Sequence, residues 1–243
     1  WGFFLQNKLS ELDSPGEWYH DEATGTLYFR APNNADPNGL QVMASVHDNG
    51  IEVGWQRQHI AIRDLAFRHH KHAGVYNTGS HVLVAACTFD HSYFGIRSYG
   101  NHGTYSGNTI HHTYASGMGL LDNNTTVENN VVEDIALQAG MGESFWGYYG
   151  MYVSGATNVV RGNRITRTGN SGVFLGGSPL VEKNTISHAL LTVNDGGGIY
   201  WDSADGAVIQ DNIISNVGGN MESVAADYFI NSPIGMGIYF GNS

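Results

Sequence analysis

Short apolar segments alternate with polar turns along most of the chain, and this pattern repeats. The clearest copy runs from 158 to 178, where two short apolar strands flank Gly162-Asn163. A polar turn from Thr168 to Ser171 follows, and a third strand occupies Gly172 to Leu175. Three short strands with three punctuated turns are typical of one rung of a parallel β-solenoid.

The repeat extends from about residue 59 to the end of the chain. A step with the pattern x-N-x-(I/V/F) begins at residues 65, 87, 108, 130, 163, 184 and 212. A glycine followed by an apolar residue marks the next strand of each repeat, from Gly74-Val75 to Gly237-Ile238. We therefore expect a single-stranded parallel β-helix of about seven rungs over 59–243. The recurring Asn residues are expected to stack as a hydrogen-bonded ladder at tight turns, where Asn tolerates a left-handed backbone.

Residues 1–58 do not follow the repeat. Two alternating segments, Gly16 to His20 and Thr26 to Arg30, are joined by a short polar link that contains Gly25. This arrangement predicts a β-hairpin. We expect 1–58 to form a small antiparallel module that leads into the β-helix.

One turn of the repeat is lengthened in three of the last four rungs. The spacing from the apolar step to the glycine is 6 or 7 residues in the short turns, but 18 at Val132–Gly150, 12 at Ile186–Gly198 and 23 at Ile214–Gly237. Insertions on one face of a repeat protein usually build its binding face. The sequence thus predicts a trough with 158–178 as its floor and loops 133–149 and 187–197 as walls.

Two columns of side chains are candidates for substrate binding. Strand alternation turns the residue two positions after each marker glycine outward, which predicts an aromatic platform suited to stacking on sugar rings. A second, polar column lies two residues past each apolar step, on the side of the core residue, and we interpret it mainly as a structural stack. We find no spacing that specifies a metal site. The binding candidates are Tyr152, Phe174, Tyr200 and Tyr239 from the platform, and Arg167 and His188 from the polar column.

Carboxylates gather in the lengthened loops. Adjacent rungs are about 4.8 Å apart, so two such side chains can fall within the ~5–9.5 Å separation used in glycoside hydrolysis. One carboxyl group needs a raised pKa to act as the general acid. We predict Asp195 as the first catalytic candidate, followed by Glu143 and Asp202. Glu222 is a further carboxylate of the third loop.

The charge balance restricts the partners. Lys and Arg total 11 against 22 Asp and Glu, giving a net charge of −11, which disfavours nucleic acids and anionic membranes. The sequence has no apolar run long enough for a membrane span. The single Cys87 excludes an internal disulfide and is interpreted as a small buried side chain. The chain opens without Met, and we expect a piece of a longer protein.

The rung pattern resembles the right-handed parallel β-helix proteins of the pectin-lyase-like superfamily. The segments 12–29 (LDSPGEWYHDEATGTLYF), 60–69 (IAIRDLAFRH) and 194–200 (NDGGGIY) are similar to bacterial β-helix proteins related to glycoside hydrolases. The resemblance implies a right-handed helix and a secreted or periplasmic carbohydrate-active enzyme. It also implies that the Asp before the Gly-Gly-x-(I/L)-Tyr strand, here Asp195, is a catalytic carboxylate.

Three functions remain open from the sequence. The leading hypothesis is a glycoside hydrolase acting on a polysaccharide or oligosaccharide, without a cofactor. The second is a polysaccharide lyase or uronan epimerase, which needs a base and positive charge, often Ca²⁺, at the uronate. The net negative charge and the scarcity of Lys rank it lower. The third is a non-catalytic carbohydrate-binding or structural solenoid.

Overall fold

The computed structural model describes residues 7–144, 146–202, 206–221 and 234–241. The chain divides into two compact units, 1–44 and 45–243. The first unit holds the antiparallel strands β1 (Trp18–Asp21) and β2 (Thr26–Phe29), which pair from Trp18↔Phe29 to Asp21↔Thr26. The predicted hairpin is confirmed. Three single-turn 3₁₀ helices complete this unit: η1 (Leu9–Glu11), η2 (Pro32–Asn34) and η3 (Pro37–Gly39).

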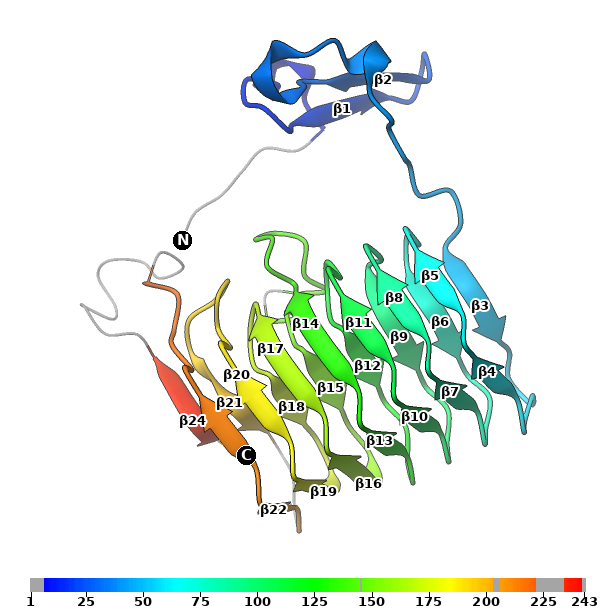
Figure 1. Ribbon diagram of the computed structural model, residues 1–243, viewed down its shortest axis with the longest axis vertical. Coiled ribbons are helices and arrows are strands. Elements are labelled where there is room, and N and C mark those ends of the chain that lie inside the picture. The colour runs from blue at the N-terminus through cyan, green and yellow to red at the C-terminus, as the bar shows by residue number, and fades with distance from the viewer. Residues whose placement is uncertain (1–6, 145, 203–205, 222–233, 242–243) are drawn as a thin grey trace. The chain divides into compact units, whose positions relative to one another are not determined.

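The second unit is a parallel β-helix built from three sheets, as predicted (Figure 1). Within the described residues, sheet I has eight strands, and sheets II and III have seven each. Sheet I contains β3 (Asn49–Val53), β6 (Ala73–Asn77), β9 (Phe94–Ser98), β12 (Met118–Leu120), β15 (Met151–Val153), β18 (Val173–Leu175), β21 (Gly196–Trp201) and β24 (Gly235–Phe240). Sheet II contains β4 (Ala61–Arg63), β7 (Leu83–Ala85), β10 (Thr104–Ser106), β13 (Thr126–Glu128), β16 (Ala156–Arg161), β19 (Ser178–Glu182) and β22 (Val208–Gln210). Sheet III contains β5 (Ala66–Arg68), β8 (Thr88–Asp90), β11 (Thr109–His111), β14 (Val131–Ile135), β17 (Arg164–Thr168), β20 (Thr185–Ser187) and β23 (Ile213–Ser215).

The first strand of sheet I lies earlier than the predicted boundary between 58 and 59. β3 pairs in parallel with β6, with Ile51 opposite Val75. The pair Gly50-Ile51 carries the glycine marker of the repeat, but no x-N-x step precedes it. The sequence analysis relied on both markers and so assigned this strand to the N-terminal segment.

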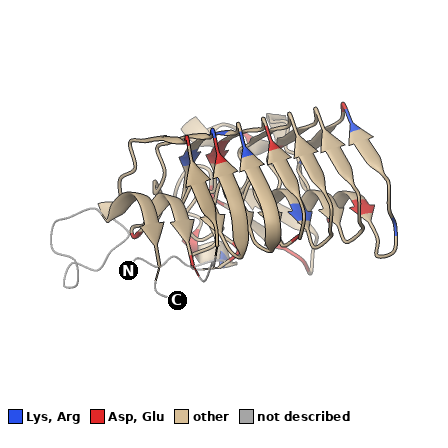
Figure 2. Cartoon of the chain, turned by 90° about the horizontal axis from the view of Figure 1, so that it is seen from below, with Lys and Arg blue, Asp and Glu red and all other residues tan. Residues whose placement is uncertain are grey.

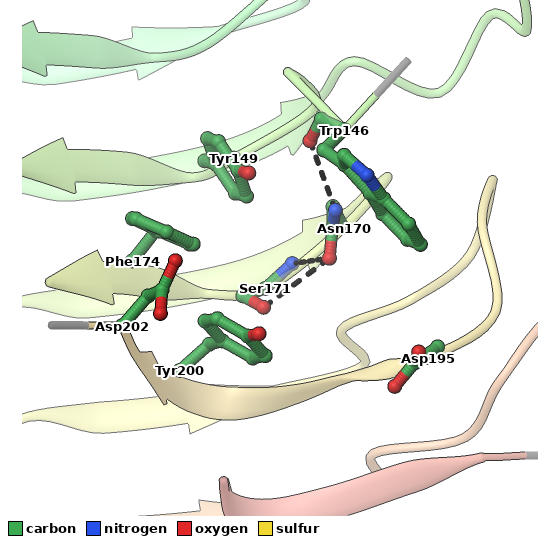
Figure 3. Close-up of a pocket in the computed structure, with 8 residues that line it drawn as sticks. All are labelled: Trp146, Tyr149, Asn170, Ser171, Phe174, Asp195, Tyr200 and Asp202. Atoms are coloured by element: carbon green, nitrogen blue, oxygen red, sulfur yellow. Dashed lines mark hydrogen bonds between the residues drawn. The ribbon is translucent and has the colours of Figure 1, made fainter. Parts of the chain in front are cut away.

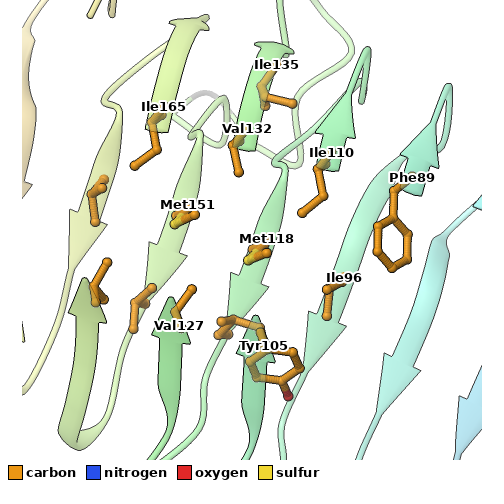
Figure 4. Packing of buried hydrophobic residues seen from close by; sticks show 14 of the residues in the cluster. Phe89, Ile96, Tyr105, Ile110, Met118, Val127, Val132, Ile135, Met151 and Ile165 are labelled. Carbon is orange, nitrogen blue, oxygen red and sulfur yellow. The ribbon is translucent and has the colours of Figure 1, made fainter. Parts of the chain in front are cut away.

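The core fills the space enclosed by the three sheets (Figure 4). The apolar residue after each marker glycine points inward, as the alternation predicted. In sheet I, these side chains are fully buried: Val75, Ile96, Met118, Met151, Val173 and Ile199. Ile238 in β24 was also predicted to point inward, but it is 42% exposed because β24 is the last strand in the order of sheet I.

A ladder of Asn side chains runs along one corner of the β-helix. The Nδ2 of Asn108 donates to Oδ1 of Asn130 (3.0 Å), and the same bond recurs at 2.9 Å from Asn130 to Asn163, Asn163 to Asn184 and Asn184 to Asn212. Each Asn also donates its backbone N–H to the next Oδ1, with Cys87 N–H at the head of the ladder. The predicted stack is confirmed.

The left-handed residue of this turn is the one before each Asn, not the Asn itself. These preceding residues all have positive φ: Ala86, Gly107, Asn129, Gly162, Lys183 and Asp211. The Asn side chain thus closes the turn by hydrogen bonding, while its neighbour takes the unusual backbone conformation. The prediction that Asn itself supplies the left-handed backbone was wrong.

Charged side chains are sparse and lie mainly at strand ends and corners (Figure 2). Several pair between neighbouring rungs, such as Arg161 Nε with Glu128 Oε2 (3.0 Å) and Arg164 Nη2 with Glu133 Oε2 (2.9 Å). None of the helical turns that the structure describes is long and apolar enough to cross a membrane.

Candidate functional site

An aromatic stripe crosses four neighbouring strands of sheet I. Parallel pairing sets Tyr152, Phe174, Tyr200 and Tyr239 opposite one another. The Phe174 and Tyr200 rings are stacked, with centroids 5.0 Å apart and planes 16° apart, whereas Tyr152 and Tyr239 meet their neighbours edge-on at 5.2 and 4.9 Å. All four side chains are half-buried. The stripe thus presents apolar ring surface with polar hydroxyl tips to solvent.

A cavity of about 250 Å³ lies over the middle of this stripe (Figure 3). Phe174 and Tyr200 belong to its floor, and Trp146 and Tyr149 reach it from the loop between β14 and β15. Asp195 enters from the loop before β21. The lining residues are Trp146, Tyr149, Asn170, Ser171, Phe174, Asp195, Tyr200 and Asp202. Both predicted wall loops therefore contribute, and the 158–178 rung lies between them.

Asn170 fixes the wall to the floor. Its Nδ2 donates to the Trp146 carbonyl (2.9 Å), and its Oδ1 accepts from the Ser171 backbone N–H (2.7 Å) and hydroxyl (3.2 Å). Asn170 is only 3% exposed. The sequence analysis read this turn only as punctuation and missed both Asn170 and Ser171. The only signal in the sequence was that these two polar residues are adjacent in a short turn, which lies between the two lengthened turns of the neighbouring rungs.

Asp195 is held by its backbone at one end of β21. Its φ is +76°, and its N–H donates to the Ile234 carbonyl at 3.0 Å. The neighbouring Asn194 accepts the Ile234 N–H through Oδ1 at 2.7 Å. Burial raises the pKa of the Asp195 carboxyl above its ordinary value. This environment favours the protonated form of Asp195.

Asp202 lines the opposite end of the same cavity, and its backbone N–H donates to the Leu175 carbonyl at 3.3 Å. The extended strand β21 separates it from Asp195. The six residues of β21 span roughly 20 Å at about 3.3 Å each. That span exceeds the ~5–9.5 Å between two carboxyl groups that act on one glycosidic bond, so the length of the strand argues against Asp195 and Asp202 as such a pair.

Glu143 does not line the cavity, because it is bound to Arg97. The guanidinium of Arg97 donates to both carboxylate oxygens of Glu143, at 2.7 and 3.3 Å, and to the Tyr99 hydroxyl at 2.7 and 3.0 Å. Arg97 also lies over the Phe94 ring, 4.9 Å from its centroid. The facing residue in sheet I is Gly119, where a Cβ would lie 2.4 Å from Arg97 Nη1. This ion pair fastens the Trp146 loop to sheet I.

Arg167 and His188 lie outside the cavity, at the exposed corner that follows sheet III. Arg167 Nε donates to Asp134 Oδ1 at 2.5 Å, and His188 Nε2 lies 3.5 Å from Asn216 Nδ2. Every member of their column has a left-handed backbone, with φ between 47° and 60°: His69, His91, His112, Asp134, Arg167, His188 and Asn216. A left-handed residue breaks strand alternation, so the predicted orientation of this column toward the core was wrong.

Among the residues that the structure describes, the cavity is lined by aromatic, acidic and neutral polar side chains, without Lys, Arg or His. Burial raises the pKa of Tyr149 and of Tyr200, and the nearby carboxylates raise both further. Both phenols therefore stay protonated at neutral pH. Glu222, a further predicted carboxylate, lies outside the described residues.

Comparisons with known proteins agree with this architecture. A family model described as "Right handed beta helix region" matches residues 49–214, and a second, overlapping match covers 122–241. The enzymatically active domain of bacteriophage CBA120 tailspike protein 2 superimposes with a TM-score of 0.57 at 13% identity, over 75% of this chain and 27% of its own. Pectate lyase Pel9A gives a TM-score of 0.42 at 11% identity, over 79% of this chain and 72% of its own. Alginate lyase from Paenibacillus sp. gives 0.39 at 12% identity, over 72% and 78%.

The chain thus spans about a quarter of the length of the tailspike domain that it resembles. Comparison with curated proteins gives no match. The family match extends over more than half of the chain and includes strands of all three sheets. The chain therefore belongs to the family of right-handed parallel β-helix proteins.

Proposed function

We propose that the chain is a carbohydrate-active enzyme that hydrolyses a polysaccharide or oligosaccharide lying along the cavity over sheet I. The observation that carries this proposal is the stacked pair Phe174 and Tyr200 beside the carboxyl group of Asp195. Aromatic faces at rung spacing offer apolar surface to the faces of sugar rings, and their hydroxyl tips offer hydrogen bonds to sugar oxygens. A substrate of this kind is met outside the cytoplasm, so we propose a secreted or periplasmic location.

Hydrolysis fits the lining better than β-elimination. A lyase abstracts a proton beside a uronate carboxylate, which requires a base and positive charge to neutralise that carboxylate. The cavity lining in the described residues has no cationic side chain, and the raised pKa values of its two tyrosines keep both phenols protonated, so neither is available as a base at neutral pH. Arg97, the cation nearest in register to the stripe, is already paired with Glu143. These features favour a neutral glycan.

Asp195 is the proposed general acid. Asp195 is half-buried, and a carboxyl group with a raised pKa keeps its proton nearer to neutral pH and can deliver it to the leaving oxygen of a glycosidic bond. The second carboxylate of a hydrolase stays a prediction from the sequence, with Glu143, Asp202 and Glu222 as candidates. Of these, Asp202 is too far along β21 to act with Asp195 on one bond, and we assign it to substrate contact at the far end of the cavity.

The test is a panel of neutral and acidic polysaccharides incubated with the protein, with and without EDTA. Reducing ends and the ultraviolet absorbance of unsaturated sugars are followed together. We expect new reducing ends without that absorbance, unaffected by EDTA. Unsaturated product that disappears with EDTA would replace the proposal with a Ca²⁺-dependent lyase. Binding without any product across the panel would indicate a non-catalytic carbohydrate-binding solenoid.

The role of Asp195 is tested by Asp195→Asn, with Asp134→Asn as a matched control on the exposed corner. Asp195→Asn should abolish reducing-end release and leave the unfolding transition in place. Asp134→Asn should retain activity. Full activity in Asp195→Asn would remove Asp195 from the mechanism.

A further inference from the structure

A cluster of one carboxylate and three imidazoles lies at the corner after sheet III, away from the cavity. It comprises Asp90, His91, His111 and His112, and we call it the Asp-His cluster. Asp90 ends β8 and His111 ends β11, and the two residues are paired in register. His91 and His112 follow them with φ of 47° and 53°. Two adjacent rungs thus present the same two positions side by side.

The nitrogens of the cluster converge on a single oxygen. Nδ1 of His91 lies 2.6 Å from Asp90 Oδ1, and Nδ1 of His111 and Nδ1 of His112 each lie 3.2 Å from the same atom. The Nδ1 atoms of His111 and His112 are 2.9 Å apart. The ligand atoms of Asp90, His91 and His112 all lie within 4.8 Å of one another.

Hydrogen bonding alone satisfies this arrangement poorly. The Nδ1 atoms of His111 and His112 lie within hydrogen-bond distance of each other and of the same Asp90 oxygen. If both nitrogens carry a proton, the two N–H groups face each other; if one does not, its lone pair faces the carboxylate. A metal ion resolves the conflict, because every ligand atom then directs a lone pair at the cation. Tetrahedral zinc with bonds of about 2.0–2.1 Å separates its ligand atoms by roughly 3.4 Å, which lies inside the range from 2.6 Å to at most 4.8 Å between the ligand atoms of Asp90, His91 and His112.

The environment suits a cation. Asp90 places one carboxylate oxygen within 3.2 Å of all three imidazole nitrogens. The His91 and His112 side chains are 42% and 48% exposed, so an ion can reach the cluster from solvent. One competing charge is present, since Arg68 Nε lies 4.0 Å from Asp90 Oδ2.

We propose that Asp90, His91 and His112 bind a divalent transition-metal ion, with His111 beside the site, and that the ion fastens the corners of two adjacent rungs. Mixed imidazole and carboxylate ligands select Zn²⁺ or its neighbours Ni²⁺ and Cu²⁺ over Ca²⁺ and Mg²⁺. The sequence spacing did not predict this site, because its ligands are two dipeptides 21 residues apart that only the rung pairing brings together.

The experiment titrates the purified, metal-stripped protein with Zn²⁺ by calorimetry, and with Co²⁺ while recording the visible spectrum. We expect one tight equivalent of Zn²⁺, a tetrahedral Co²⁺ spectrum and a higher melting temperature with Zn²⁺. His112→Asn should weaken binding at least about tenfold, because even outer-sphere partners of a metal site contribute that much. Asn suits this position, since Asn216 occupies it with the same left-handed backbone.

His188→Asn is the matched control, because it changes a residue of the same column several rungs away and should leave binding unchanged. This control matters because the chain has 12 His residues that can bind metal weakly. Arg68→Ala should tighten binding by removing the competing charge. The absence of a tight equivalent, or equal affinity in His112→Asn and wild type, would overturn the proposal. Neither result would bear on the cavity over sheet I.

Discussion

The Asn ladder allows a quantitative prediction of stability, with Asn163→Ala as the perturbation. The Asn163 Oδ1 accepts two hydrogen bonds from Asn130, and its Nδ2 donates to the Val127 carbonyl and to Asn184 Oδ1, all at 2.9 to 3.0 Å. Asn163 is 1% exposed, so water cannot replace these partners. Alanine removes all four bonds and leaves the Asn130 backbone N–H buried without an acceptor.

The expected cost follows from these contacts. Four hydrogen bonds at about 1 kcal/mol each, with about 1–3 kcal/mol more for a stranded buried donor, give a loss of roughly 5–7 kcal/mol in the free energy of unfolding. Domains are typically stable by only about 5–15 kcal/mol. The variant should therefore unfold at a much lower denaturant concentration. The measurement is urea unfolding in the cold, followed by circular dichroism.

Asn212→Ala is the internal comparison, because Asn212 also makes four bonds: it accepts two from Asn184 and donates one each to the carbonyls of Val181 and Gln210. Asn212 is only half-buried, so water can take over its partners. We expect a loss of about 1–2 kcal/mol there. If Asn163→Ala costs no more than Asn212→Ala, the argument that burial sets the value of the ladder is refuted.

Three further predictions concern the cavity and its wall. Phe174→Ala should weaken oligosaccharide binding about tenfold, measured by calorimetry, whereas Tyr76→Ala, at the same register but on β6, should not; equal losses would contradict the platform. For Asp195, whose pKa is raised by burial, activity should fall as pH rises through that pKa. The contribution of the Asp195 carboxyl group to folding stability is complete below its pKa in the unfolded chain and is lost as pH rises through its higher pKa in the folded protein. Asp195→Asn should therefore be at least as stable as wild type at neutral pH and should lose that advantage in acid. A variant that is less stable than wild type at neutral pH would contradict this prediction. Gly119→Ala should lower the melting temperature and speed proteolysis of the Trp146 loop, since the new Cβ would displace Arg97 from Glu143; an unchanged melting temperature and cleavage rate would show that the ion pair survives.

The sequence was sufficient to predict the fold because the same packing requirements recur at the same positions of each rung. Six of the seven marker glycines, all but Gly237, occur where a Cβ would meet core atoms or the neighbouring backbone. At Gly95 and Gly172, for example, a Cβ would lie within 2.8 Å of a carbonyl oxygen of the next rung. The inward residues follow by alternation. The β3 strand escaped detection because it has the glycine but lacks the Asn step.

The site was predicted less completely, because the position of a carboxylate in a loop depends on which residues elsewhere in the chain that loop contacts. The trough walls followed from insertion lengths, and the outward aromatic stripe followed from register. Nothing in the local sequence linked Glu143 to Arg97, which is 46 residues away. The left-handed corner at Arg167 and His188 was also invisible, since residues of many types occupy that position and none of them is glycine.

The Asn ladder also bears on how such a chain can acquire new specificities. Successive ladder partners are 21, 22, 33, 21 and 28 residues apart in sequence, yet their side-chain or backbone bonds to the next Asn stay at 2.9 to 3.0 Å. The hydrogen bonds between neighbouring rungs therefore form whatever the number of residues in the loop of each rung. Recognition loops can then be exchanged between rungs, or grafted from related proteins, without redesigning the scaffold that displays them.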